Sequence, residues 1–384
     1  MLIRALRFMK PFRLFRWIVI AAGAFACGCA CAAGPGLTVA ADGTVVRDGK
    51  PYVGVGVNYF DCFLRALIDP RDTSYTTGFA TLARYEIPFA RYAACGFWPK
   101  EMSLYLSDRV EYFRRLDAVV GAAKEHGIGL IPSLFWNLSC VPDLVGEPCD
   151  QWGNSQSKTR EFMRQYVRAV VGRYRDSPAI WAWEFGNEFS LAANLPNAAT
   201  HRPMIAPKRG TPESRTVRDE LHYDHVVDAF AEFAREVRKL DPTRLIENGD
   251  AMLRSSAWHN RQEKSWRADT PAQFQEMVRL TTPDPLNAVS VHCYGENLAR
   301  VAVAAEAAAA LRKPLFVGEF QIPDATSPSA RPQLEAILTK LRAAHVPLAA
   351  IWVYDLRSQE STFSITENNA RGWELEVLRE WNHR

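Results

Sequence analysis

The stretch AIWAWEFGNE, residues 179–188, decides the fold class of this chain. It is almost continuously apolar and ends in Asn187 and Glu188. A strand of this composition is buried on both faces, which is typical of parallel strands covered by helices. Seven further stretches have the same character: YVGVGVN from Tyr52, PFARYAA from Pro88, IGLIPSLFW from Ile128, RLIENGD from Arg244, AVSVHCY from Ala288, PLFVGEF from Pro314 and LAAIWVYDL from Leu348.

Helical patterns separate these eight predicted strands. Residues 108–126, 157–175, 221–240 and 331–345 have apolar residues at spacings of three and four, and residues 299–311 are rich in alanine. Strand followed by helix, repeated eight times, predicts a single (β/α)8 barrel. An open doubly wound sheet is the alternative, but the first strand is not followed by a G-x-G-x-x-G phosphate loop.

Composition and charge exclude several classes of protein. The 384 residues are 48% hydrophobic and 23% charged, which excludes a disordered, collagen-like or multi-span membrane chain. The net charge of +3 comes from five basic residues within positions 1–16, and the rest holds 41 basic and 43 acidic residues. A nucleic-acid partner is therefore not expected.

Residues 1–33 have the pattern of a secretory signal. Basic residues precede an apolar run over residues 17–26, and Ala30-Cys31-Ala32 offers an A-x-A cleavage site. The run is too short for a stable membrane span. We therefore expect export to the periplasm or the exterior, and one catalytic domain at residues 34–384. A lipid anchor on Cys27, Cys29 or Cys31 is the alternative.

Five cysteines remain after the leader, so at least one thiol has no partner within the chain. Cys140 and Cys149 flank a short loop, CVPDLVGEPC, and we predict a disulfide between them. A bridge between Cys62 and Cys95 is the weaker second possibility. The mature part has no C-x-x-C pair, so a metal site is not predicted.

Two carboxylates stand where a barrel carries its chemistry, at the carboxyl ends of strands. Glu188 ends the fourth predicted strand and Glu319 nearly ends the seventh, so the two side chains would face each other across the barrel mouth. Cleavage of a glycosidic bond needs such a pair, one as acid and one as nucleophile at about 5 Å. Arg91 ends the second strand and could keep one carboxylate ionised. Each of the two glutamates could instead belong to a structural ion pair.

Five short motifs in order on the predicted strands resemble clan A of the glycoside hydrolases, and family 5 within it. They are FARYA, WAWEFGNEF, VHCY, FVGEF and IWVYD, and the resemblance covers residues 50–357. It implies that Glu188 is the general acid/base and Glu319 the nucleophile. It further implies supporting roles for Asn187 at the sugar 2-hydroxyl, Tyr294 and Arg91 beside Glu319, His292 beside Glu188, and Trp352 under the reacting sugar.

The third strand departs from the family pattern. It ends Leu134-Phe135-Trp136-Asn137, where family 5 enzymes often carry histidine, and Phe189 stands where many have proline. The end of this strand is more similar to that of β-mannanases than to that of cellulases. We therefore expect Trp136 at the substrate, with β-1,4-mannan as the favoured polymer and β-glucan as the second.

Long segments follow the fourth and fifth strands, at residues 189–220 and 251–275. Such loops build the cleft of a barrel enzyme, and Trp258 and Trp266 in the second one suit sugar rings. We predict a monomeric, endo-acting, retaining β-glycoside hydrolase that needs no cofactor. The alternatives are an exo-acting β-mannosidase or β-glucosidase, a transglycosylase, and a non-catalytic glycan-binding barrel.

Overall fold

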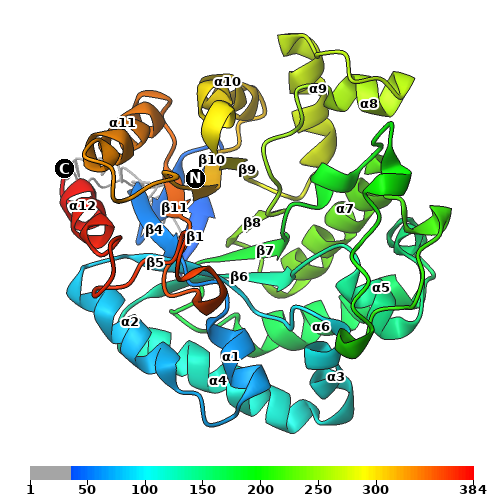
Figure 1. Ribbon diagram of the computed structural model, residues 1–384, viewed down its shortest axis with the longest axis horizontal. Helices are drawn as coiled ribbons and strands as arrows, with labels where there is room; N and C mark the ends of the chain where they lie inside the picture. Colours follow the sequence, from blue (N-terminus) through cyan, green and yellow to red (C-terminus); the bar gives the residue numbers. More distant parts are fainter. Residues whose placement is uncertain (1–35) are drawn as a thin grey trace, which may run out of the picture. The chain divides into compact units, whose positions relative to one another are not determined.

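Eight parallel strands form the central sheet of residues 36–384, the part of the chain that this computed structural model describes (Figure 1). Their order in the sheet is β8-β7-β6-β5-β4-β11-β10-β9. Every residue in them is buried, as their apolar composition predicts. The strands are β4 (Gly54–Asn58), β5 (Phe89–Ala93), β6 (Gly129–Phe135), β7 (Ala182–Gly186), β8 (Leu245–Glu247), β9 (Val289–Cys293), β10 (Leu315–Phe320) and β11 (Leu348–Ile351). Each lies within one of the eight predicted stretches, so the predicted (β/α)8 barrel is confirmed.

Asn287 joins the two ends of this sheet. Its backbone N–H donates to the Ile246 carbonyl oxygen at 3.0 Å, and its side-chain Oδ1 accepts from the Ile246 N–H at 2.7 Å. These two bonds link the segment before β9 to β8, which are otherwise the outer strands of the order. The barrel is therefore closed here by a side chain as well as by the backbone.

Helices surround the strands in Figure 1, and the five predicted helical segments are confirmed as α4, α6, α7, α10 and α11. Asp108 caps α4 and Ser157 caps α6 through their side chains. None of the helices within residues 36–384 is both long and apolar enough to cross a membrane. Their bounds are α1 (Cys62–Ile68), α2 (Ser74–Arg84), α3 (Pro99–Ser107), α4 (Arg109–Glu125), α5 (Cys140–Val145), α6 (Lys158–Tyr174), α7 (Tyr223–Leu240), α8 (Ala257–Glu263), α9 (Pro271–Thr281), α10 (Val301–Ala310), α11 (Ala330–Ala343) and α12 (Trp373–Asn382).

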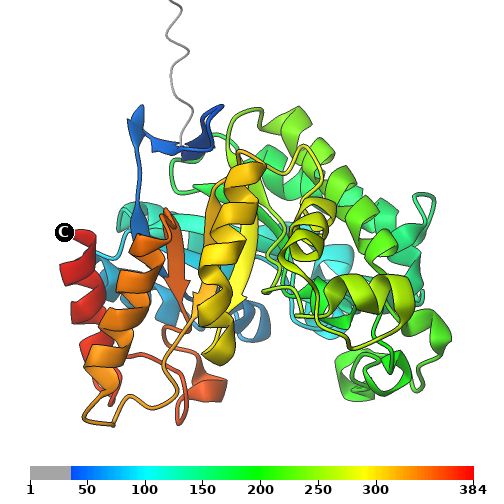
Figure 2. The same cartoon turned by 90° about the horizontal axis from the view of Figure 1, so that it is seen from above.

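A small antiparallel sheet that the sequence pattern did not predict covers the amino-terminal end of the barrel. It consists of β1 (Leu37–Val39), β2 (Val45–Arg47) and β3 (Lys50–Pro51). The Leu37 N–H donates to the Trp181 carbonyl oxygen at 2.8 Å, and the Arg47 guanidinium lies 3.9 Å from the centroid of the Trp181 ring. Figure 2 shows this sheet, in dark blue, at the end opposite to the arrowheads of β9 and β10. The carboxyl ends of the strands are thus free to carry a site.

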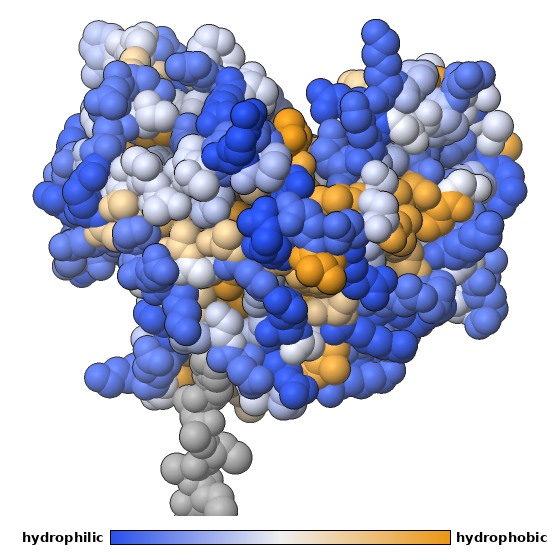
Figure 3. All heavy atoms as spheres, turned by 90° about the horizontal axis from the view of Figure 1, so that it is seen from below, coloured by the Kyte–Doolittle hydropathy of each residue, from blue (hydrophilic) through white to orange (hydrophobic). Residues whose placement is uncertain are grey.

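The segment between β7 and α7 has short 3-10 turns and no long helix. These turns are η2 (Phe189–Ala192), η3 (Ala198–Thr200), η4 (Pro207–Arg209) and η5 (Val217–Asp219). Further 3-10 turns are η1 (Cys149–Gly153), η6 (Gly295–Arg300) and η7 (Arg357–Gln359). In Figure 3 the carboxyl-terminal face of the barrel is at the top, where a notch separates two raised lobes. The strand ends therefore open into a hollow of the surface.

The predicted disulfide is wrong, because all five cysteines of the described residues are free and buried. The Cys140 Sγ donates to the Gly96 carbonyl oxygen at 3.6 Å, whereas Cys149 begins η1, where burial and the nearby charge of Asp219 raise the pKa of its thiol. The alternative bridge is also wrong, since the Cys95 Sγ accepts from the Trp136 N–H at 3.2 Å. The sulfur atoms of Cys140 and Cys95 thus each have a polar partner of their own. The predicted leader at residues 1–33 and the lipid-anchor alternative lie outside the described residues.

Candidate active site

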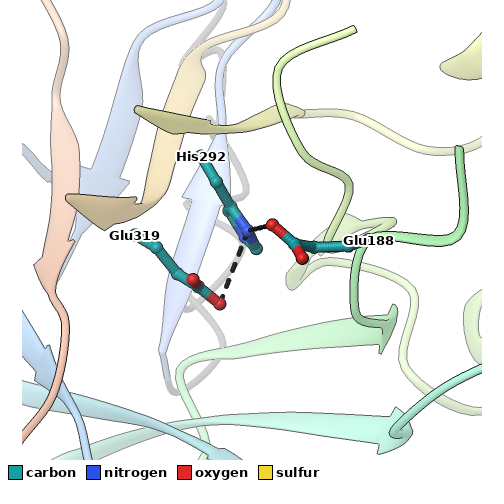
Figure 4. Close-up of side chains that lie close together, drawn as sticks. All are labelled: Glu188, His292 and Glu319. Atoms are coloured by element: carbon teal, nitrogen blue, oxygen red, sulfur yellow. Dashed lines mark hydrogen bonds and ion pairs between the residues drawn. The ribbon is translucent and has the colours of Figure 1, made fainter. Parts of the chain in front are cut away.

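Glu188 and Glu319 face each other at the carboxyl ends of the strands, with His292 between them (Figure 4). Glu188 follows β7, His292 lies in β9 and Glu319 lies in β10. The His292 Nδ1 is 2.9 Å from one Glu188 oxygen and 3.4 Å from one Glu319 oxygen. One oxygen of each carboxylate and this nitrogen all lie within 4.8 Å of one another. The structure thus brings together the two glutamates expected to face each other and the histidine expected near Glu188.

Arg91 is the hub of the site. It is completely buried in β5, and its guanidinium donates to four side chains at once. Those bonds reach the Glu184 carboxylate at 2.6 Å, the Asn187 Oδ1 at 2.7 Å, the Glu319 carboxylate at 2.9 Å and the Asn58 Oδ1 at 3.0 Å. Arginine can do this because its planar fork carries five N–H donors. The hub therefore fixes Glu319 and Asn187 in one frame.

The second oxygen of Glu319 accepts from the Tyr294 hydroxyl at 2.6 Å. Burial and the negative charge of Glu319 raise the pKa of Tyr294 well above its ordinary value. The phenol therefore stays protonated and remains a donor. Glu319 is only 4% exposed, and each of its two carboxylate oxygens accepts a hydrogen bond, one from Arg91 and one from Tyr294. These two bonds fix the position of its side chain.

Two more buried carboxylates lie deeper in the barrel. Glu184 pairs with Arg91, as expected for an interior residue, and Glu247 in β8 is completely buried. Burial, followed by the charge of Glu184, raises the pKa of Glu247 well above its usual range. Glu247 therefore favours its protonated form next to the ion pair of Arg91 and Glu184.

The backbone at Glu188 has a positive φ of 56°, which is uncommon for a residue with a side chain. The end of β8 holds this turn in place. The Glu188 N–H donates to the Gly249 carbonyl oxygen at 3.0 Å, and the Ser190 N–H donates to the Asp250 Oδ1 at 2.8 Å. A Cβ on Gly249 would lie 1.8 Å from the Gly186 carbonyl oxygen, so this approach requires glycine.

Asp250 and Asn58 are site neighbours that no sequence motif marked. Burial raises the pKa of Asp250 to about 6, and its Oδ2 has no hydrogen-bond partner within the described part of the chain. The Asn58 Nδ2 donates to the Gly318 carbonyl oxygen at 2.9 Å, next to Glu319. Their place at strand ends was visible in the sequence, but only their contacts distinguish them from the other polar residues there.

Aromatic side chains, Trp352 and Trp136 among them, form a row around Phe60, whose ring centroid lies 5.1 Å from the Arg91 guanidinium. Phe60 contacts both indoles, with ring centroids 5.4 Å from Trp352 and 4.9 Å from Trp136. Phe97 stacks on Trp136 at 4.5 Å. The Trp352 Nε1 donates to the Gln359 Oε1 at 2.8 Å, so this indole is held at its edge as well.

Trp258 is not brought to this cluster. It lies on α8, where its Nε1 donates to the Glu276 carboxylate of α9 at 3.0 Å and its backbone N–H donates to Asp269. In Figure 1 these two helices lie at the edge of the barrel. The expectation that Trp258 contacts substrate therefore has no support in the geometry, because its polar edge faces a neighbouring helix.

The charge state of Glu188 depends on its neighbours. Burial pulls the pKa of Glu188 up, but the hydrogen bond and charge of His292, together with the charge of Arg91, outweigh it and leave the pKa below its ordinary value. The Glu188 side chain is 33% exposed, whereas that of Glu319 is 6% exposed. Glu188 is therefore the carboxylate that solvent or an incoming molecule can reach.

Glu188, His292 and Glu319 have ligand types and spacing that a metal ion could use. However, the Arg91 guanidinium lies 2.9 Å from the same Glu319 oxygen that faces His292, and a cation there would meet its full charge. The hydrogen bond between His292 and Glu188 and the one from Arg91 to Glu319 account for this clustering without an ion. We therefore assign no metal to this cluster.

The chain is similar to known proteins in sequence and in fold. Residues 91–356 match the Cellulase family, glycosyl hydrolase family 5. A stretch of 81 residues is 40% identical to mannan endo-1,4-beta-mannosidase F of Aspergillus clavatus, and it covers 20% of this chain and 18% of that protein. The chain thus spans under a fifth of the length of that curated relative.

Solved structures share the barrel at low sequence identity. The endo-1,4-beta-mannanase of Rhizomucor miehei matches with a TM-score of 0.63 and 16% identity, over 90% of this chain and 99% of that one. An exo-beta-1,4-mannosidase from Opitutaceae bacterium strain TAV5 matches with a TM-score of 0.57 and 17% identity, over 90% of this chain and 63% of that one. At such identities the likeness concerns the fold alone.

Proposed function

This chain belongs to the Cellulase family, glycosyl hydrolase family 5, and from that premise we propose that it is a retaining endo-β-1,4-mannanase. Glu319 is the nucleophile in this proposal and Glu188 the general acid/base. The observation that carries it is the approach of one oxygen of each carboxylate to within 4.8 Å of the other. Retaining glycosidases place their carboxyl groups about 5–5.5 Å apart, whereas inverting ones leave about 6.5–9.5 Å for a water molecule.

In the first step, Glu319 attacks the anomeric carbon of the reacting sugar and Glu188 protonates the leaving oxygen. The carbon–oxygen bond to the leaving sugar breaks as the bond to the Glu319 oxygen forms, which gives a covalent glycosyl-enzyme. Arg91 and Tyr294 hold both oxygens of Glu319 in place before attack. In this proposal Asn187, whose Oδ1 accepts from Arg91, donates its Nδ2 to the sugar 2-hydroxyl.

In the second step, Glu188 takes a proton from water as that water attacks the glycosyl-enzyme, and Glu319 leaves as a carboxylate. The lowered pKa of Glu188 in the free protein suits this basic role. Its acidic role needs a higher pKa. A bound leaving sugar would supply that rise by covering the exposed third of the Glu188 side chain.

The choice of β-1,4-mannan rests on the mannosidase name of the sequence relative and on Trp136 at the end of β6, where the aromatic row lies. β-Glucan is the second substrate in this proposal. A panel of mannan, galactomannan, glucomannan, carboxymethylcellulose, mixed-linkage glucan and xylan tests both. A ladder of short oligomers from mannan alone is the expected result, and cleavage of xylan or cellulose with mannan untouched would overturn the assignment.

The same panel separates endo from exo action. The exo alternative is favoured by one observation: the segment after β7 is long and is held down by ion pairs of Arg202, Arg209, Arg215 and Arg218. A fixed segment of this kind could close one end of the cleft. Monosaccharide as the first product from mannohexaose would establish exo action, whereas products of mixed length require an open cleft.

The roles of the two glutamates are tested separately from the substrate. Glu319→Ala should lose turnover of every good substrate, by at least about 10⁴-fold. Glu188→Ala should still react with an activated aryl glycoside, and added azide should restore turnover and give a glycosyl azide of retained configuration. Azide that gives no product would remove Glu188 as acid/base.

We further propose that residues 34–384 are the catalytic domain and residues 1–33 an export signal. The compact unit Gly34–Arg384 supports the first boundary. Amino-terminal sequencing of the exported protein tests the second. A start after residue 32 or 33 is expected, and a lipid-modified Cys27, Cys29 or Cys31 would replace simple cleavage by anchoring.

A further inference from the structure

Glu184 and Glu247 are two carboxyl groups in the barrel interior that take no part in the two reaction steps above. They are register partners on the neighbouring parallel strands β7 and β8, so their side chains project from the same face of the sheet. Both are completely buried, and the Oε1 of each has no hydrogen-bond partner within residues 36–384. Two neighbouring acceptors in a closed interior are unfavourable unless one of them carries a proton, because a protonated carboxyl group can donate.

The contacts of the two groups indicate which of them carries that proton. The Arg91 Nε donates to the Glu184 Oε2 at 2.6 Å, and the four side chains to which Arg91 donates do not include Glu247. A cation stabilises the ionised form of the carboxylate that it contacts, so Glu184 is the ionised partner. Burial, the charge of Glu184 and a hydrogen bond with Glu184 raise the pKa of Glu247 well above its usual range, which keeps the proton on Glu247.

The second oxygen of Glu247 is connected to the turn at Glu188. The Gly249 N–H donates to the Glu247 Oε2, and the Gly249 carbonyl oxygen accepts from the Glu188 N–H at 3.0 Å. The same glycine packs on Glu184, because a Cβ on Gly249 would lie 2.8 Å from the Glu184 Cδ. Glu247 therefore contacts, with one oxygen each, the partner of Arg91 and the residue that holds the turn at Glu188.

We propose that Glu247, as a protonated acid, is a positioning residue for both catalytic glutamates, which face each other in Figure 4. Its hydroxyl donates to the Glu184 Oε1, which leaves the Glu184 Oε2 for Arg91, the residue that holds the nucleophile. Its other oxygen holds Gly249, and Gly249 holds the turn that carries the acid/base. This inference rests on the proposed hydrolase function, and it adds a buried residue that acts through others and does not touch the substrate.

Two isosteric substitutions test where the proton lies. Glu247→Gln has an amide in place of the acid, so it can donate to Glu184 and accept from Gly249 as the protonated acid does. It should keep kcat on mannohexaose within about threefold of the wild type. Glu184→Gln removes the charge that Arg91 contacts, and it should lower kcat by about 10²-fold. Equal losses in the two variants, or a larger loss in Glu247→Gln, would overturn the assignment.

Glu247→Ala tests the positioning role. It leaves the Gly249 N–H and the Glu184 Oε1 without their partner, so kcat should fall by about 10²-fold. The KM for mannohexaose should change by less than about threefold, because Glu247 does not touch the substrate. A wild-type kcat in the folded variant would overturn the proposal. If this variant does not fold, the two glutamine variants and the infrared spectrum decide it.

The proton itself is visible in the infrared spectrum, since a protonated carboxyl group has a C=O stretching band that an ionised one lacks. Asp250 and Glu374, whose pKa values burial raises to about 6 and about 7, are largely ionised at about pH 8. A band should remain at that pH in the wild type and disappear in Glu247→Gln. A wild-type spectrum without the band, or a band that survives in Glu247→Gln, would overturn the proposal.

Glu236→Gln is the matched control, because Glu236 is another buried glutamate but lies on α7. Burial pulls the pKa of Glu236 up, but its hydrogen bonds with Lys239 and Arg168 leave the pKa below its ordinary value. This carboxylate is therefore ionised, and its substitution should leave both the infrared band and kcat unchanged.

A failure of this inference can be told apart from a failure of the hydrolase proposal. If the wild-type protein cleaves none of the β-linked substrates, the hydrolase proposal fails, and hydrogen exchange of the Glu188 amide takes the place of kcat. The arrangement then holds if the infrared band is present and this amide exchanges about tenfold faster in Glu247→Ala but not in Glu247→Gln. Equal exchange in the wild type and Glu247→Ala overturns it.

Discussion

A buried arginine holds the hub around Arg91, and another holds the segment between β7 and α7. The residues that contact these two arginines are brought to them in different ways. Arg91 contacts side chains on or next to strands β4, β7 and β10. In the β7–α7 segment, Arg215 donates to both oxygens of Asp143, at 2.6 and 2.7 Å, and lies 3.4 Å from Asp219. Both arginines are at most 4% exposed at the side chain.

The difference between the two regions lies in what fixes the partners. Strand ends of a parallel barrel meet at one face whatever their side chains are, so Arg91 finds its partners through the backbone. Arg215 has no such frame, and its pair with Asp143 is itself what places the segment. Removing a charge from the hub should therefore lower turnover, whereas removing a charge from the segment should make the segment less ordered.

The largest expected effect comes from Arg91→Ala. It leaves Glu184 and Glu319 buried without their cation, so the free energy of unfolding should fall by about 3–5 kcal/mol. Turnover should fall at least about 10³-fold, because Glu319 and Asn187 lose the hydrogen-bond donor that fixes their positions. Urea unfolding and aryl-glycoside kinetics measure the two effects.

Arg91→Lys is the control for charge. Lysine keeps the positive charge but cannot serve four acceptors in one plane, so it should recover stability better than turnover. Equal recovery of both would mean that charge alone matters, and the hub would then not differ from any buried ion pair.

The sequence predicted more of the hub than of the segment for the same reason. All eight strands and the contacts of Arg91 with Glu319, Tyr294 with Glu319 and His292 with Glu188 could be expected, because a parallel barrel brings strand ends together. The 37–51 sheet, Asp250 and the place of Trp258 could not. They depend on side-chain contacts between distant residues, which leave no periodicity in the sequence.

Asp250→Asn should sharpen the comparison through pH. The folded pKa of Asp250 is about 6, against an ordinary value of 3.8, so the folded protein binds this proton more tightly than the unfolded chain. The contribution of this group to the stability of the wild type should therefore decrease as the pH rises from about 4 to about 6, and it should stay constant at higher pH. Asparagine keeps the acceptor for the Ser190 N–H and has no charge to bury.

The variant should accordingly be more stable than the wild type at pH 7–8, by up to roughly 3 kcal/mol, and the difference should vanish near pH 3. Urea unfolding of both proteins across this range measures it. If the unfolding free energies of the two proteins depended on pH in the same way, Asp250 would have the same proton affinity in the folded and the unfolded protein.

Arg215→Ala tests the segment. The unfolding free energy should fall by about 2 kcal/mol, less than for Arg91, because the segment can move aside and let water reach Asp143 of α5. Arg218→Ala is the matched control, since this arginine is 55% exposed and pairs with Asp150, and it should change stability by less than about 0.5 kcal/mol. Limited proteolysis should cut Arg215→Ala within residues 194–222 faster than either the wild type or the control. Cleavage elsewhere first would mean that the pair does not fix this segment.

The smallest expected effect concerns the cysteines that border the same region. Cys149 lies beside Asp219, and Cys140 bonds the Gly96 carbonyl oxygen, so neither thiol is available to the other. Reductant should leave the melting temperature unchanged, and Ellman's reagent should titrate the five thiols of residues 36–384 only after unfolding. A Cys140–Cys149 bridge would instead leave three thiols, and its reduction would lower stability by roughly 2–3 kcal/mol. That result would place a covalent bond between α5 and η1, the two elements with which Arg215 and Arg218 pair, and the ion pairs of the segment would then rest on a covalently fixed support.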